Sequence, residues 1–128
     1  MPSPVYQFSG DFDHDVNYLV SEANGYQSRE VGLITGGELL YAGTVLGVVT
    51  ASGSLKRFTP AATDGSQNAA AILMYRADAR TADARCTITA RDAEVNGLML
   101  RWPAGITLAQ RNAAIQQLGS GPRIFVRT

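Results

Sequence analysis

The sequence predicts a small, β-rich α+β domain with one main helix and a long extended N-terminal arm. Three observations predict it: short aliphatic and β-branched runs bounded by turn residues, one capped helix signal near the C-terminus, and a terminal segment with period-two alternation. With 128 residues the chain forms one domain, long enough to bury about two-thirds of its unfolded surface. We expect an arm over residues 1–30 and a globular domain over residues 31–128.

The arm combines aromatic residues with acidic ones. Asp11, Asp13 and Asp15 occupy odd positions, whereas the even positions carry most of the aromatic and apolar side chains. This alternation predicts an extended strand with one aromatic and one carboxylate face. The strand either folds back to complete the protein's own sheet or pairs with another chain by β-augmentation. We favour the second, with these residues in contact with the partner: Tyr6, Phe8, Phe12, Val16, Tyr18 and Val20.

Several runs in the body have strand character. Residues 31–34 form one, and residues 39–50 are expected to form a long central strand. Gly43 and Gly47 weaken a strand unless backbone passes close by, so they indicate a bulge or a tight contact. Residues 69–73 are a short apolar run, for which both helix and strand remain open.

The second half of the chain adds two further strands and the helix. Residues 85–91 alternate, with Cys86, Ile88 and Ala90 expected to face inward, and residues 124–126 form a C-terminal strand. Residues 98–100 are another apolar run, and residues 77–84 indicate a surface loop or one exposed helical turn. The main helix is expected at about residues 107–118, because Thr107 and Gln110 form a capping box and Gly119 is a natural stop.

The overall charge gives no reason to expect nucleic acid or a membrane as a partner. Eleven basic and eleven acidic residues give a formal net charge of zero. The charge is uneven, since residues 1–30 balance at −4 and the remaining residues at +4. No apolar run approaches the roughly 20 residues of a membrane span. The N-terminus lacks the pattern of a signal peptide, and one cysteine fits a reducing cytoplasm.

The acidic residues of the arm match the 1, 3, 5 and 12 spacing of an EF-hand calcium loop, with Glu22 in the last place. Val16 stands where that loop needs glycine, and no amphipathic helix precedes it. The alternation also puts the aspartates on one face of an extended segment. We therefore expect a solvated acidic face and no metal site.

The remaining reactive residues do not form a catalytic pattern. His14 is the only histidine, it lies in the arm, and Cys86 has the inward parity of a strand. Asp92 and Glu94 are paired carboxylates, for which solvation or an ion pair with Arg91 or Arg101 is the expectation. The sequence also lacks metal-ligand and phosphate-binding motifs. We expect neither an enzyme nor a cofactor.

Five segments in order resemble the small head decoration proteins of lambda-like tailed bacteriophages. They are GTVLG at 43–47, PAATDGS at 60–66, AAAIL at 69–73, SEANG followed by SRE between 21 and 30, and RDAEVN at 91–96. The resemblance covers roughly residues 18–127, and little of it extends before residue 18.

The resemblance implies a structural protein made in the host cytoplasm and carried on the outer surface of the virion. Proteins of this family bind as homotrimers at the three-fold and quasi-three-fold sites of the expanded capsid and stabilise it. The implied partners are the major capsid protein, which would pair with the arm, and two further copies of this chain. The alternative is a trimeric tail or baseplate module that binds another protein.

Overall fold

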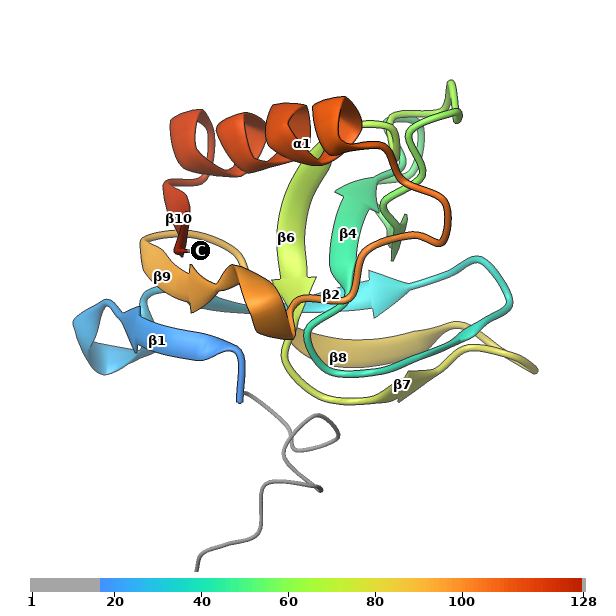
Figure 1. The fold of residues 1–128 in the computed structure, drawn as a ribbon. Helices are drawn as coiled ribbons and strands as arrows, with labels where there is room; N and C mark the ends of the chain where they lie inside the picture. Colours follow the sequence, from blue (N-terminus) through green and yellow to red (C-terminus); the bar gives the residue numbers. More distant parts are fainter. Residues whose placement is uncertain (1–16, 128) are drawn as a thin grey trace, which may run out of the picture.

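Strands β2, β5, β4, β6 and β8 follow one another around a closed barrel, which occupies the centre of the molecule in Figure 1. The computed structural model describes residues 17–127. The strands are β1 (Leu19–Glu22), β2 (Arg29–Ile34), β3 (Leu39–Leu40), β4 (Val45–Val48), β5 (Leu55–Arg57), β6 (Ala69–Leu73), β7 (Ala77–Asp78), β8 (Ala84–Thr89), β9 (Ala93–Asn96) and β10 (Ile124–Arg127). The helices are η2 (Asn24–Tyr26) and η3 (Gly97–Met99), both 3-10, and α1 (Leu108–Ser120).

The barrel closes unevenly around β2. On one side β2 pairs with β8 over its full length, from Arg29 opposite Thr89 to Ile34 opposite Ala84. On the other side it joins β5 through the single pair Ile34–Leu55. Most of that second edge of β2 therefore lies outside the sheet pairing.

A second sheet and the helix complete the fold. β9 lies between β1, which is antiparallel to it, and β10, which is parallel to it. α1 crosses above the barrel and packs on β6 and β10 (Figure 1). The described ends of the chain thus meet in one sheet, because β1 and β10 flank the same strand.

Two clusters of buried side chains fill the interior. The barrel core consists of Ile34, Leu40, Leu46, Leu55, Ala71, Leu73, Ala77, Ala79 and Ile88. The outer core, under α1 and the second sheet, consists of Tyr18, Val45, Phe58, Ala69, Ile72, Met74, Val95, Leu100, Ala114, Leu118 and Ile124. Because β4 and β6 contribute to both clusters, their two faces are both buried.

The β-rich fold with one main helix is confirmed, and so are several local predictions. The side chain of Thr107 accepts a hydrogen bond from the Gln110 backbone N–H at 3.1 Å, and the Gln110 side chain accepts one from Thr107 at 3.0 Å. Residues 124–126 lie in β10 as predicted, and residues 69–73, for which helix and strand were both open, form strand β6. Gly47 lies at a register shift, and a Cβ there would be 2.6 Å from the backbone of Ser66.

Some predictions about the body were wrong. Residues 39–50 do not form one strand, because the chain turns between β3 and β4, where Gly43 has a φ of +89° and faces the Met99 carbonyl. Residues 98–100 overlap the 3-10 helix η3, and Leu98 is 78% exposed. Cys86 is only partly buried, and its Sγ donates to the Tyr75 carbonyl, whereas Thr89 of the same strand is fully buried.

The segment predicted as a surface loop at 77–84 begins with the short strand β7, which pairs with β3. Ala77 and Ala79 are both buried in the barrel core. The rest of the segment, up to the start of β8, lies at the surface. This stretch therefore covers one end of the barrel core instead of lying wholly outside it.

Candidate interaction surfaces

The side chain of Tyr18 fixes the start of the described chain to the body. Its ring is fully buried, and its hydroxyl lies 2.6 Å from the Thr89 hydroxyl. The Tyr18 carbonyl accepts a hydrogen bond from the Asn96 N–H at 2.7 Å. Burial raises the pKa of the Tyr18 hydroxyl, so the group stays neutral in its site. The predicted arm therefore has a fixed root at Tyr18.

A polar cluster holds the connection that follows β1. The Glu22 carboxylate accepts hydrogen bonds from the Ser28 hydroxyl at 2.5 Å and from both the Nε and Nη2 of Arg29, at 3.0 and 2.7 Å. These bonds lower the pKa of Glu22, the bond from Arg29 most strongly. A bidentate arginine–carboxylate pair also fixes the relative orientation of the two side chains. The cluster joins β1 to the first residues of β2.

The structure places only part of the predicted contact residues. Tyr6, Phe8, Phe12 and Val16 lie outside the described residues, as do the three aspartates of the predicted acidic face. Tyr18 lies in the outer core, so its ring offers no surface to a partner. Val20 lies at an irregularity between Leu19 and Ser21 and is 51% exposed. From residue 19 the predicted arm is a strand of the protein's own second sheet.

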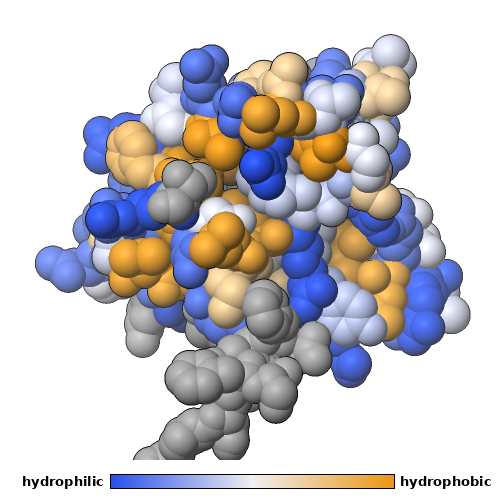
Figure 2. Space-filling view, viewed as in Figure 1, coloured by the Kyte–Doolittle hydropathy of each residue, from blue (hydrophilic) through white to orange (hydrophobic). Residues whose placement is uncertain are grey.

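Apolar side chains lie exposed near this root. Figure 2 shows hydrophobic surface over the region of β1 and η3, next to the point where the described chain begins. Val20 and Leu98 are the exposed large hydrophobic residues of these two elements. Single exposed apolar residues are normal, whereas a contiguous apolar patch is typical of an interaction site. The parity argument was confined to the N-terminal segment, so it did not identify Leu98, which lies in the 3-10 helix η3.

A second candidate surface lies along the open edge of β2. Val31 is 62% exposed, and Leu33 is also exposed. A groove of about 360 Å³ runs beside this edge and is lined by Val31, Leu33, Val48, Leu55, Ala71 and Ile88, among others. An unpaired strand edge beside apolar side chains is a typical place for another chain to add a strand.

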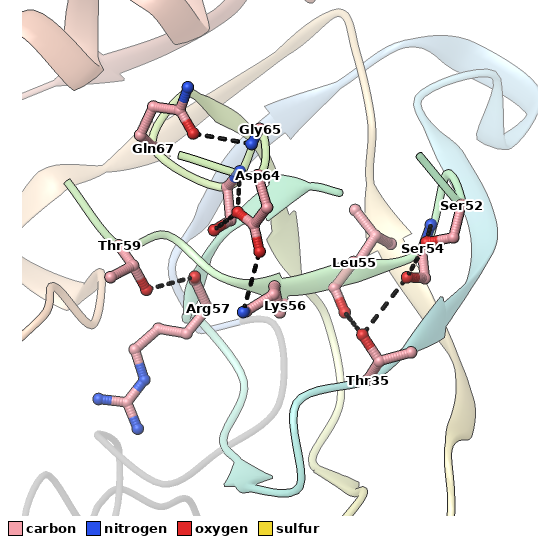
Figure 3. Close-up of polar contacts among 11 residues, drawn as sticks. Thr35, Ser52, Ser54, Leu55, Lys56, Arg57, Thr59, Asp64, Gly65 and Gln67 are labelled. Atoms are coloured by element: carbon pink, nitrogen blue, oxygen red, sulfur yellow. Dashed lines mark hydrogen bonds and ion pairs between the residues drawn. The ribbon is translucent and has the colours of Figure 1, made fainter. Parts of the chain in front are cut away.

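The loop between β5 and β6 is held by its own hydrogen bonds (Figure 3). Asp64 accepts from the Ser66 hydroxyl at 2.6 Å, from the Ser66 N–H at 3.0 Å and from the Lys56 ammonium at 3.2 Å. These contacts, the Ser66 hydroxyl first, lower the pKa of Asp64 to about 2. The Gly65 N–H donates to the Gln67 side chain at 2.8 Å. This loop therefore presents a fixed surface.

The paired carboxylates of β9 and its neighbour are engaged in ion pairs. Asp92 pairs with Arg123 at 2.8 Å, and Glu94 lies 3.3 Å from Arg127. The expectation of ion pairing was correct, but the expected partners were wrong, since Arg91 pairs with Glu30. The two arginine partners lie in β10 and directly before it. The parallel pairing of β10 with β9 brings them close to the carboxylates.

The described residues show no arrangement typical of a metal site. Over residues 17–127, no group of three or more histidine, cysteine, aspartate or glutamate side chains is placed to hold an ion. Within the same residues, no helix is long and apolar enough to cross a membrane. The features that remain are surfaces and edges suited to protein contact.

A family model built from known proteins matches most of the chain. The family model described as bacteriophage lambda head decoration protein D matches residues 13–122. The match includes the root at Tyr18, the whole barrel and helix α1. No curated protein matches the chain.

Proposed function

The chain belongs to the family of bacteriophage lambda head decoration protein D, and from this membership we propose that it binds the expanded capsid as a homotrimer and stabilises it. As a phage head decoration protein it is a structural component of the capsid surface. In the proposal, the trimers occupy the three-fold and quasi-three-fold sites, and the segment before Tyr18 pairs with the major capsid protein. The family match over residues 13–122 is the observation that carries this function.

Stabilisation of this kind needs no catalysis. A ligand that binds only the assembled, expanded shell stabilises that state by its free energy of binding. Three arms on one trimer would add to this, because the second and third would bind at a high effective concentration once the first is in place.

The fixed root supports an arm that reaches away from the body. Sixteen residues precede Asn17, and a fully extended chain of that length spans roughly 55 Å. Because Tyr18 is buried, the proposed contact residues of the arm become Tyr6, Phe8, Phe12 and Val16, with the exposed Val20 at its base. Tyr18 then serves to hold the arm and not to touch the capsid.

Loading of the purified protein onto expanded, undecorated capsids tests the proposal. Every described helix and strand lies within residues 19–127, so deleting residues 1–16 should leave the body folded and abolish loading. Phe12→Asp should weaken loading sharply, because it places a charge on the aromatic face. Asp13→Asn is the matched control on the opposite face: it removes one of three carboxylates and adds no charge to the aromatic face, so it should reduce loading far less than Phe12→Asp at moderate salt.

Two results would contradict the proposal. Wild-type occupancy by the truncated protein would show that the arm is not the contact with the capsid. Light scattering that gives the mass of a monomer at tens of micromolar protein would exclude the trimer.

A further inference from the structure

A small pocket lies between the turn that joins β3 to β4 and the segment that leads into α1. Its volume is about 150 Å³, and its lining includes two guanidinium groups, those of Arg57 and Arg101. The other lining residues are Leu39, Leu40, Tyr41, Thr44 and Trp102. The pocket thus combines positive charge with apolar and aromatic walls.

The polar groups of this pocket are suited to a carboxylate. The Arg101 guanidinium lies over the Tyr41 ring, 5.2 Å from its centroid, and its Nε donates to the Ala42 carbonyl. Arg57 pairs with Glu38, yet its side chain remains 40% exposed. A guanidinium has five N–H donors in a planar fork, so one carboxylate partner does not exhaust it. Arg57 therefore retains donors for a second acceptor.

Trp102 gives an independent indication of a missing acceptor. Its indole N–H is buried and has no hydrogen-bond partner among the described residues. A buried donor without an acceptor is rare and costs free energy. Trp102 lines the same pocket as the two arginines, so a carboxylate that enters there would lie beside the indole and change its surroundings.

The described chain begins beside this pocket. A Cβ placed on Gly43 would lie 3.9 Å from the Tyr18 ring, so the two residues are adjacent. The backbone N–H of Arg101 donates to the Gly43 carbonyl at 2.8 Å. Asp15 and Asp13 precede Asn17 by two and four residues, or about 7 and 13 Å of extended chain. The aspartates are therefore within reach of the pocket of their own subunit.

The charge distribution favours binding of these aspartates to the pocket. Residues 1–30 balance at −4 and the rest of the chain at +4. We propose that the pocket of Arg57, Arg101 and Trp102 binds the aspartate carboxylates of the chain's own N-terminal segment, residues 11–15. An extended segment held by its carboxylate face would turn its aromatic face away from the body. Only this last consequence, presentation of the aromatic face to the capsid, rests on the proposed function.

The single tryptophan allows a direct test on the full chain without capsids. The ¹⁵N-labelled protein has one indole N–H resonance, that of Trp102. At low salt we expect this resonance to shift when Asp11, Asp13 and Asp15 are all replaced by Asn. Raising NaCl to about 1 M should move the wild-type resonance to the same position, because salt screens exposed charge pairs, and should leave the triple variant unchanged.

Variants on the pocket side complete the test. Arg57→Gln should move the indole resonance in the same direction as the triple variant. Arg111→Gln is the matched control, since Arg111 lies exposed on α1, and it should leave the resonance in the wild-type position. Circular dichroism checks that each variant is folded.

Two outcomes would overturn the inference. One is an indole resonance at the same position in the wild type and the triple variant at low salt. The other outcome comes from mixing labelled triple-variant chains with unlabelled wild-type chains. If the indole resonance of the labelled chains then returns to its wild-type position, the segment binds a neighbouring subunit and not its own. Neither outcome depends on capsid loading, so failure here is distinct from failure of the proposed function.

Discussion

The barrel core and the outer core differ in where their residues come from. The barrel core is built entirely from residues 34–88, whereas the outer core requires both ends of the described chain, Tyr18 and Ile124. The two share β4 and β6, whose neighbouring residues Ile72 and Leu73 point to different clusters. The barrel can therefore be completed by the middle of the chain, while the arm root becomes fixed only when the C-terminal strand is also in place.

Leu73→Ala and Leu118→Ala form the strongest test of this difference. Both side chains are fully buried, one in each core, and each substitution should lower the free energy of unfolding by about 2–5 kcal/mol, as measured by urea unfolding. Amide hydrogen exchange should distinguish the effects of the two substitutions. Leu118→Ala should increase exchange mainly in α1, β10 and β1, whereas Leu73→Ala should increase it throughout. Equal loss of protection in β2 and β8 in both variants would show that the cores unfold as one unit.

Tyr18→Phe should have a smaller effect, confined to the outer core. The change keeps the ring but removes the hydroxyl, so the buried hydroxyl of Thr89 loses its partner. We expect a loss of roughly 1 kcal/mol in the free energy of unfolding. Tyr41→Phe, at an exposed ring, is the control and should change it by less than about 0.5 kcal/mol. An unchanged stability of the Tyr18 variant would mean that the hydroxyl bond does not help to hold the root.

Glu22→Gln should give the smallest effect, visible as a difference in acid sensitivity. The folded protein lowers the pKa of Glu22 below its unfolded value, which is about 4.3. The stabilisation is therefore complete above that unfolded value and is lost as the pH falls through the lowered folded value. Thermal unfolding between pH 7 and pH 3 should show a steeper fall for the wild type than for Glu22→Gln. Parallel curves would contradict a stabilising role of the Arg29 and Ser28 bonds.

Features set by neighbouring residues were predictable from the sequence, and features set by distant residues were not. The capping box of α1 involves two residues three positions apart, and it was found. The glycine at 47 indicated close backbone contact, but not that Ser66 would supply it. The turn at Gly43 faces the Met99 carbonyl, more than fifty positions away, so the aliphatic and β-branched character of residues 39–50 did not reveal it.

The candidate site shows the same division. Parity placed Tyr18 and Val20 on one face, but the ring of Tyr18 is buried in the outer core beside Thr89, whereas Val20 is 51% exposed. The choice between helix and strand for residues 69–73 stayed open because β6 is buried on both faces, which removes the alternation that marks a half-buried strand. The open edge of β2 depends on how β5 meets it, and pairing between strands is not a local property.

The placement of β1 beside β9 also has a mechanical consequence. Any tension on the N-terminal segment enters the body at Tyr18 and passes into the antiparallel pairing of β1 with β9. A pull directed along β1 loads its hydrogen bonds to β9 together, instead of opening them one after another. The buried ring of Tyr18 would have to leave the outer core before the strand could slide. The root is thus arranged to resist force along the strand, as the proposed attachment of the arm to a pressurised shell would apply it.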